Sequence, residues 1–507
     1  MALTTVTDYL ELTAAKFPAK VAFADATREM TFSELRTEAR RVASVLLGLG
    51  LHHQPVAVFL DKSAVCIAAF LGALYSGNFY TPLDTAMPES RIQKILTTLQ
   101  PAVVVTDEAH EDAAKAFAGE AKVLTYEAMM RPAADEAAVD AAAQQVIDTD
   151  ICYVLFTSGS TGTPKGVIIS QRSVLDYVCW FADTFCIDAQ NVFGNQAPLY
   201  FDLSIQDVYL PIITGSMTQL LPQELFSFPA KLMKILLEKR VNAIMWSPSA
   251  LCVVANMKGL RVKERPDLCL VAFCGEIMPV KQLNLWRDAY PQARFINLYG
   301  PTEACDACTY YVIDRKYSIT ETLPIGKPCK NTDILLLSDS DKKITPDEIG
   351  RIGELCIRGT SLACGYYADA KKTQAAFVQN PLNTAYHEII YRTGDLVHYN
   401  ERGELMYDGR KDFQIKHMGY RIELGEIETA AGSLAGVDAN ACVYDAERDR
   451  IHIFYVGKTD EETLKHGLAQ LVPHYMMPGA IHHLAAMPLN LNGKIDRTAL
   501  KEQVKEA

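Results

Sequence analysis

The stretch Thr157-Ser-Gly-Ser-Thr-Gly-Thr-Pro-Lys-Gly166 lies between two short apolar runs, at residues 151–156 and 167–169. Both runs have the composition of buried strands. Glycines let backbone N–H groups approach an anion, hydroxyls donate further hydrogen bonds, and Lys165 adds a positive charge. The stretch therefore predicts a loop that holds a polyphosphate.

The alternative interpretation of this stretch is a flexible turn, which loops rich in Gly, Ser and Thr usually form. The sequence Pro164-Lys-Gly166 and the predicted strand on each side favour a phosphate loop instead. It is not the P-loop of nucleoside triphosphatases. That motif needs a glycine five residues after its first glycine, and here Pro164 follows Gly159 at that distance.

The composition is that of a globular protein, with 507 residues, 49% of them hydrophobic and 22% charged. A formal net charge of −12 argues against nucleic acid or an anionic membrane as the main partner, because both attract basic surfaces. We expect no membrane insertion, since no apolar run approaches the ~20 residues that span a bilayer. Thirteen scattered cysteines predict reduced thiols and a cytoplasmic location.

The predicted fold class is α/β. Apolar runs alternate with amphipathic stretches up to about residue 323, which predicts parallel sheets flanked by helices. Within this part we expect a helix that Ser33 caps and a loop at residues 80–84. Short β-rich runs at about 323–408 predict a β-rich subdomain. Residues 1–408 would thus form an N-terminal core, and 413–507 a compact α+β unit.

Two further motifs carry groups that suit a nucleotide. Asn297-Leu-Tyr-Gly-Pro-Thr-Glu303 follows a predicted strand. In it, Tyr299 could stack on a purine, Thr302 could donate to a phosphate, and Glu303 is a hard oxygen ligand for Mg²⁺. Tyr391-Arg-Thr-Gly-Asp395 ends a strand with a carboxylate that could accept two ribose hydroxyls. The structural alternatives are a plain strand-to-turn connection and an aspartate in a β-turn.

Together these motifs resemble those of the adenylate-forming superfamily, which contains acyl-CoA synthetases, luciferases and amino-acid adenylation domains. The resemblance extends from residue 80 to residue 497. It implies ATP and Mg²⁺ as cofactors, Glu303 as the metal ligand, and Thr302 and Glu303 as catalytic residues. The residues that it places around the nucleotide are Thr157, Ser158, Gly159, Ser160, Thr161, Gly162, Lys165, Gly275, Glu276, Asn297, Leu298, Tyr299, Gly300, Pro301, Thr302, Asp395, Tyr407, Arg410 and Lys494.

The same resemblance assigns roles in the C-terminal part. Lys494 follows Asn-Gly in a motif whose lysine bridges the substrate carboxylate and the α-phosphate. Removing such a charge donor typically costs on the order of 10²–10³ in rate. Residues 409–412 would form a hinge at Asp412, about which a small mobile lid, 413–507, rotates between two half-reactions. Gly419 would leave room for a thin pantetheine arm.

Phe201-Asp-Leu-Ser204 indicates the substrate class. A carboxylate among apolar groups is costly to bury unpaired, and an α-ammonium group would pair with Asp202. In amino-acid adenylation domains the matching aspartate has this role, whereas fatty-acyl and aryl ligases lack it. The structural alternative is an aspartate that caps a helix.

Within the superfamily the chain looks most similar to the D-alanine–D-alanyl carrier protein ligases, through Asn195-Gln-Ala-Pro198, Phe201-Asp-Leu-Ser204, Phe273-Cys-Gly-Glu276 and Gly409-Arg-Lys-Asp-Phe-Gln-Ile-Lys416. That resemblance implies that Cys274 helps to shape a small pocket. Two positions depart from that group: Asp306 replaces a valine that lies against the substrate methyl, and Leu298 replaces a threonine. Either the pocket is wet, or Asp306 turns away, or the substrate brings a donor or a cation, as serine, lysine or ornithine would. The predicted substrate residues are Phe201, Asp202, Cys274, Leu298, Asp306 and Lys494.

We therefore expect an amino-acid adenylating ligase that forms aminoacyl-AMP from ATP and then transfers the aminoacyl group to a carrier-protein thiol. No phosphopantetheine attachment motif is found, so the carrier would be a separate protein, or the acceptor free coenzyme A. Two alternatives remain. An acyl- or aryl-CoA ligase conflicts with Asp202, and a non-catalytic nucleotide-binding regulator conflicts with the presence of Lys165, Glu303, Asp395 and Lys494.

Overall fold

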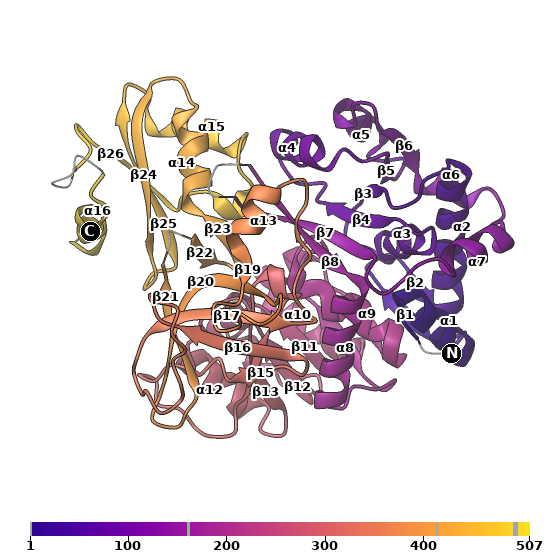
Figure 1. Ribbon diagram of the computed structural model, residues 1–507, viewed down its shortest axis with the longest axis horizontal. Helices are drawn as coiled ribbons and strands as arrows, with labels where there is room; N and C mark the ends of the chain where they lie inside the picture. Colours follow the sequence, from indigo (N-terminus) through magenta and orange to yellow (C-terminus); the bar gives the residue numbers. More distant parts are fainter. Residues whose placement is uncertain (1–2, 160–162, 412–413, 490–494, 507) are drawn as a thin grey trace. The chain divides into compact units, whose positions relative to one another are not determined.

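The computed structural model describes residues 3–159, 163–411, 414–489 and 495–506 (Figure 1). The chain divides into two compact units. The first comprises residues 1–85, 99–155 and 167–411, and the second comprises 86–98, 156–166 and 412–507. Across the described ranges, no helix combines the length and the apolar character needed to cross a membrane.

The first unit contains a nine-stranded sheet in the order β15-β14-β13-β12-β11-β9-β10-β1-β2. The six strands from β13 to β1 run parallel, and β14, β15 and β2 join the edges antiparallel. Its strands are β1 (Val21–Ala24), β2 (Glu29–Thr31), β9 (Val192–Asn195), β10 (Met217–Leu220), β11 (Ala243–Trp246), β12 (Leu270–Phe273), β13 (Arg294–Tyr299), β14 (Thr309–Val312) and β15 (Lys327–Pro328).

A second, seven-stranded sheet has the order β18-β8-β7-β4-β3-β5-β6. The strands from β7 to β6 are parallel, and β18 is antiparallel to β8. Its strands are β3 (Pro55–Phe59), β4 (Phe79–Leu83), β5 (Val103–Thr106), β6 (Lys122–Thr125), β7 (Ile151–Thr157), β8 (Lys165–Ser170) and β18 (Gly365–Tyr366). The two sheets confirm the predicted α/β class with parallel sheets.

Helices join the two sheets through one core. α3 (Ala64–Tyr75) packs on β3 and β4, α9 (Ile205–Thr214) packs on β1, β9 and β10, and α1 (Val6–Lys16) contacts both helices. α8 (Gln171–Phe185) packs beside α9. A single apolar cluster contains residues from these helices and from both sheets.

The opposite face of the nine-stranded sheet has its own core. On β11, Met245 belongs to the first cluster, whereas Ile244 and Trp246 belong to a second one, because successive side chains of a strand point to opposite faces. The helices that contribute to this second cluster are α10 (Pro229–Glu238), α11 (Pro248–Asn256) and α12 (Val280–Ala289).

The predicted β-rich subdomain is an antiparallel sheet. The order is β16-β17-β20-β19, and β21 pairs with the long central strand β20. Its strands are β16 (Thr332–Leu337), β17 (Gly353–Gly359), β19 (Phe377–Gln379), β20 (Ile389–Tyr399) and β21 (Leu405–Arg410), with α13 (Ala370–Ala376) before β19.

The second unit is α+β, as predicted. Alternate side chains of its three-stranded sheet belong to two clusters: Ile453 to the cluster of α14 and α15, and Phe454 to the cluster of Leu500 on α16. Its elements are α4 (Glu89–Leu99), β22 (Gln414–His417), β23 (Tyr420–Glu423), α14 (Leu424–Gly432), β24 (Val437–Asp445), β25 (Arg450–Gly457), α15 (Glu461–Ala469), β26 (Ala480–His483) and α16 (Arg497–Glu506).

Two local predictions are wrong. Thr31, not Ser33, caps α2 (Phe32–Gly48): its hydroxyl accepts from the Glu34 N–H, and the Glu34 carboxylate accepts from the Thr31 N–H. The predicted loop at 80–84 is largely the strand β4. Pro82 cannot donate to a ladder, which disfavours a strand. All five residues of β4 are buried, however, and this apolar burial outweighs one missing donor.

His452 and His482 form a pair on the face of the small sheet that α16 covers. His452 is 6% exposed, and its Nδ1 lies 2.9 Å from Nε2 of His482. The two rings are parallel, and His482 also stacks on Phe454. Burial lowers the pKa of both histidines, and the nearby Arg450 lowers them further.

This pair predicts a loss of local stability in acid. Because the folded-state pKa values lie below the ordinary ~6.5, the unfolded segment takes up protons first as the pH falls. The contribution of the neutral histidine pair to folding stability is therefore complete above about pH 6.5, and it is lost as the pH falls below that value. We expect the α16 amides to be less protected from hydrogen exchange at about pH 5.5 than at about pH 7.5, and His482→Phe to reduce the difference. Equal protection at both pH values in the unmodified protein would contradict this.

Candidate functional site

The predicted functional residues of the first unit gather at the carboxyl ends of the parallel strands. β12 leads into Cys274-Gly-Glu276, and β13 ends at Tyr299 and leads into Gly300-Pro-Thr-Glu303. Ligands of open α/β sheets bind at this edge. Gly275 has φ 100°, and a Cβ on Gly300 would collide with the Asp306 carbonyl. Both positions therefore require glycine.

The carboxylate of Asp395 is held by groups from two different sheets. The Tyr299 hydroxyl on β13 donates to its Oδ2, and Nη1 of Arg410 on β21 donates to its Oδ1 at 2.7 Å. Asp395 is 3% exposed. A carboxylate has about four acceptor sites, so capacity for two ribose hydroxyls remains. Burial, and then the charge of Asp395, raises the pKa of Tyr299 well above its ordinary value, so the phenol stays a donor.

Tyr407 completes this group. Its ring lies 6.2 Å from the ring of Tyr299, between centroids, at an interplanar angle of 45°. The structure thus brings together the predicted nucleoside residues Tyr299, Asp395, Tyr407 and Arg410, although they come from separate stretches of the sequence.

Glu303 lies in the short helical turn that follows β13. It is fully buried, and the Tyr366 hydroxyl on β18 donates to its Oε1 at 2.7 Å. Mg²⁺ bound with a nucleotide usually takes one or two carboxylates besides phosphates and water, and one buried carboxylate fits that pattern. No group of three metal-ligating side chains occurs in the part of the chain that the structure describes.

Asp202 lies beside the same turn. It begins a 3-10 turn, Asp202–Ser204, just before α9, and the Thr302 hydroxyl donates to its carboxylate. The sequence predicts that Thr302 donates to a phosphate, and this stays a prediction; in the structure its hydroxyl donates to Asp202. Phe201 is half-buried, whereas Cys274 and Leu298 are each 2% exposed. The Asp202 carboxylate therefore accepts a hydrogen bond from the residue that directly precedes the proposed metal ligand, Glu303, in the chain.

Asp306 is buried and held in place by two residues that the sequence did not single out. The Tyr177 hydroxyl on α8 donates to Oδ2 at 2.8 Å, and the Gln206 side-chain amide on α9 donates to the same oxygen. Asp306 has φ 81° and Cys305 has φ 54°, both in the left-handed region. The signal was present in the sequence, because an aspartate in an apolar run demands partners, but those partners lie about 100 or more residues away.

A second buried carboxylate fixes α9. Asn195, at the end of β9, donates through Nδ2 to Asp207 at 2.7 Å. Burial raises the pKa of Asp207 to about 7, since the hydrogen bond from Asn195 and the charge of Lys62 oppose it only in part. Because Asp207 follows Gln206 directly, this contact also fixes the helix that presents Gln206 to Asp306.

Other predicted nucleotide residues have structural partners. Oε2 of Glu276 accepts from the N–H of Ser249 at 2.8 Å and from its hydroxyl at 2.7 Å, at the start of α11. Nδ2 of Asn297 donates to the carbonyl of Pro324 at 2.8 Å. These contacts fix the loops after β12 and β13.

The phosphate loop belongs to the second unit. The Ser158 hydroxyl donates to the Arg421 carbonyl at 2.7 Å and accepts from the Glu423 N–H at 3.2 Å. The buried Thr157 hydroxyl has no hydrogen-bond partner within the described ranges, so it is a candidate donor to a ligand. Lys165 begins β8 and is half-buried. Ser160, Thr161 and Gly162 lie outside the described residues.

Two further predictions also fall outside the description: Lys494 and the hinge residue Asp412. Gly419 is described. It follows Met418 in the two-residue turn between β22 and β23, with φ 84° and 53° respectively. Positive φ at both positions is typical of a tight hairpin turn.

The Asp395 contacts generate a test. Asp395→Asn keeps the shape of the side chain but removes the charge that faces Arg410, and it weakens acceptance from ribose hydroxyls. Hydrogen bonds to a charged group contribute about 1.5–3 kcal/mol, so we expect the KM for ATP to rise by roughly 10- to 100-fold. Steady-state pyrophosphate release at varied ATP measures this. An unchanged KM for ATP would show that Asp395 does not contact the nucleotide.

Comparisons with known proteins identify the family. The model of the AMP-binding enzyme family matches residues 10–367. The chain is 30% identical to a D-alanine–D-alanyl carrier protein ligase of Bacillus licheniformis, over 96% of this chain and 97% of that protein. It is 32% identical to tyrocidine synthase 3 of Brevibacillus parabrevis over 99% of its own length, but it spans 8% of that protein.

The fold has a close counterpart among solved structures. An adenylation domain of Vibrio cholerae, AlmE, solved in complex with glycyl-adenosine-5′-phosphate, matches with a TM-score of 0.83 and 22% identity, over 100% of this chain and 99% of that one. At this identity the similarity concerns the fold alone. With the family match and the ligase relative, it confirms the resemblance to the adenylate-forming superfamily: the chain belongs to the AMP-binding enzyme family.

Proposed function

We propose that this chain activates an amino acid with ATP and transfers it to the phosphopantetheine thiol of a separate carrier protein. The observation that carries the proposal is the hydrogen bond from Thr302 to Asp202. Thr302 directly precedes Glu303 in the chain. This contact supports the proposal because Asp202, which we assign to the α-ammonium group, accepts from the residue that precedes Glu303, which we assign to Mg·ATP. A reducing, cytoplasmic location suits the thirteen cysteines, all of which are free thiols.

In the first step, the substrate carboxylate attacks the α-phosphorus of ATP, an acyl–phosphate bond forms, and pyrophosphate leaves. The carboxylate is already a nucleophile, so no general base is needed. Asp395 and Arg410 orient the ribose, Asp202 holds the α-ammonium group, and Lys494 stabilises the negative charge that develops between the two reactants. Mg²⁺, held by Glu303, would neutralise phosphate charge.

In the second step, the carrier thiol attacks the acyl carbon, a thioester forms, and AMP leaves. Gly419 precedes β24–β26 in the sequence and Lys494 follows them. Lys494 acts in the first step, and Gly419 makes room for the pantetheine arm in the second. Rotation of residues 413–507 about Asp412 would exchange them. We also propose the domain boundaries, the hinge and the mobility of the lid.

The environment of Asp306 favours a substrate whose side chain carries a hydrogen-bond donor. Gln206 is fully buried, and its Oε1 has no hydrogen-bond partner among the described residues. The amide cannot simply turn over, because its nitrogen already donates to Asp306 and Tyr177. A buried acceptor without a partner costs about 1–3 kcal/mol. Serine, lysine or ornithine could satisfy it, whereas D-alanine, the remaining candidate, could not.

Pyrophosphate release with single amino acids, in both hands, tests the activity. We expect one amino acid, or a few of similar shape, to support release. With that substrate, Asp202→Asn should lower kcat/KM by roughly 10- to 100-fold, since hydrogen bonds to a charged group contribute about 1.5–3 kcal/mol and Asp202 is half-buried. The KM for ATP should hardly change, which is the reverse of the pattern expected for Asp395→Asn.

Three outcomes would overturn the assignment. If carboxylic acids without an amino group support release equally well, the chain is an acyl- or aryl-CoA ligase. If Lys494→Ala leaves aminoacyl-AMP formation unchanged, Lys494 is not catalytic. If no acid supports release while ATP still binds, the chain is a nucleotide-binding regulator.

A swap at Asp306 tests the side-chain proposal separately. Asp306→Val introduces the residue expected of D-alanine ligases and removes the acceptor that orients Gln206. We expect the preference to shift away from side chains with a donor and towards alanine, by about 10-fold in the ratio of kcat/KM values. Asp306→Asn, of the same shape, is the matched control for lost charge alone. A wild-type enzyme that already prefers D-alanine would contradict the proposal.

A further inference from the structure

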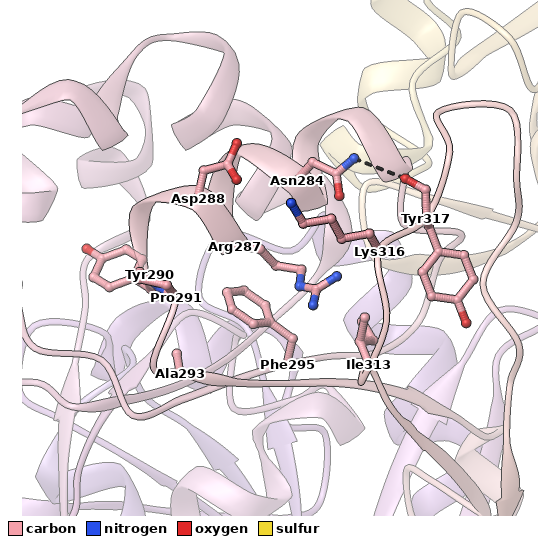
Figure 2. Close-up of a pocket in the computed structure, with 10 residues that line it drawn as sticks. All are labelled: Asn284, Arg287, Asp288, Tyr290, Pro291, Ala293, Phe295, Ile313, Lys316 and Tyr317. Carbon is pink, nitrogen blue, oxygen red and sulfur yellow. Dashed lines mark hydrogen bonds between the residues drawn. The ribbon is translucent and has the colours of Figure 1, made fainter.

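A pocket opens at the amino end of β13, the end of the strand that lies away from the predicted active site (Figure 2). Its volume is about 510 Å³, and α12, the start of β13 and the segment after β14 supply its lining. Phe295 lies in this pocket, whereas the predicted nucleotide residues begin at the other end of the same strand. At ~3.3 Å per residue, Phe295 and Tyr299 are about 13 Å apart, so an occupant here could not share the reacting atoms.

Three charged side chains line the pocket. Arg287 and Lys316 are cationic, and Asp288 is anionic. Asp288 and Lys316 are both exposed, and neither forms an ion pair or a hydrogen bond in the described part of the chain. Arg287 donates from one nitrogen to the Arg315 carbonyl, which orients the guanidinium and leaves other N–H groups of its fork for a ligand.

The floor of the pocket is apolar. Phe295, Ile313 and Tyr317 are 3%, 6% and 4% exposed, and all three belong to the core cluster on this face of the sheet. Figure 2 shows the Phe295 ring beside the Arg287 side chain. Because these groups are packed from below, the floor is rigid and already formed, which is typical of small-molecule sites.

We propose that this pocket binds a second amino acid as a zwitterion, one with an aromatic or large aliphatic side chain. The ligand carboxylate would meet Arg287 and Lys316, its ammonium group would meet Asp288, and its side chain would cover Phe295. A simple anion fits less well because Asp288 opposes it, and a simple cation is opposed by two positive groups. The site is distinct from the one at Asp202, so it does not depend on the proposed function.

The test is calorimetric titration of the full chain with L-phenylalanine and two analogues that each lack one charge. 3-Phenylpropionate lacks the ammonium group, and phenylalaninamide lacks the carboxylate. Exposed ion pairs are weak, so we expect phenylalanine to bind about two- to fivefold more tightly than either analogue. Asp288→Asn should remove only the preference for phenylalanine over 3-phenylpropionate. Lys316→Met should reduce only the preference for phenylalanine over phenylalaninamide.

Lys281→Met is the matched control, since Lys281 is an exposed residue of α12 that does not line the pocket. It should change neither preference. Asp288→Asn and Lys316→Met should also leave pyrophosphate release with the reacting amino acid unchanged, which separates this pocket from the active site. The proposal would be overturned if the three ligands bind equally well, if none of them binds, or if neither variant changes their binding.

Discussion

The hydrogen bonds that hold Asp395 connect two sheets that otherwise have separate strand orders. Tyr299 belongs to the nine-stranded sheet, and Asp395 and Arg410 belong to the antiparallel one. A buried carboxylate without partners would be costly. The strand that carries Asp395 must therefore lie close enough to the end of β13 for Tyr299 to donate to it. This constraint brings the β-rich subdomain to the carboxyl edge of the parallel strands, where the loops after β12 and β13 carry the other site residues.

The same physical problem, a buried acidic group, recurs around the site. Glu303 is held by Tyr366, Asp306 by Tyr177 and Gln206, and Asp207 by Asn195. Each contact links an acidic residue of one element to a neutral donor of another. A neutral donor positions a carboxylate without itself supplying a positive charge. In a chain of net charge −12, this arrangement suits a substrate with a positive group.

The pocket at the opposite end of β13 follows a different pattern. Its charged residues Asp288 and Lys316 are exposed and have no ion-pair partners among the described residues, Arg287 is half-buried, and the apolar floor belongs to the core. The strand thus separates two environments: buried acids with hydrogen-bond partners at its carboxyl end, and more exposed charged groups at its amino end.

The sequence by itself determined the fold class, the family and most of the local elements, because these depend on short-range patterns: buried runs such as 243–246, and glycine- and hydroxyl-rich turns such as 157–166. It also singled out Asp202, Asp395 and Asp306. It gave the wrong cap for α2, because two hydroxyl residues lie close together there. It gave a loop in place of the strand β4, where a proline lies within a buried apolar run. Only the tertiary structure decided what each acid contacts. Tyr177 and Gln206 carry no motif, and they meet Asp306 because α8 and α9 pack side by side.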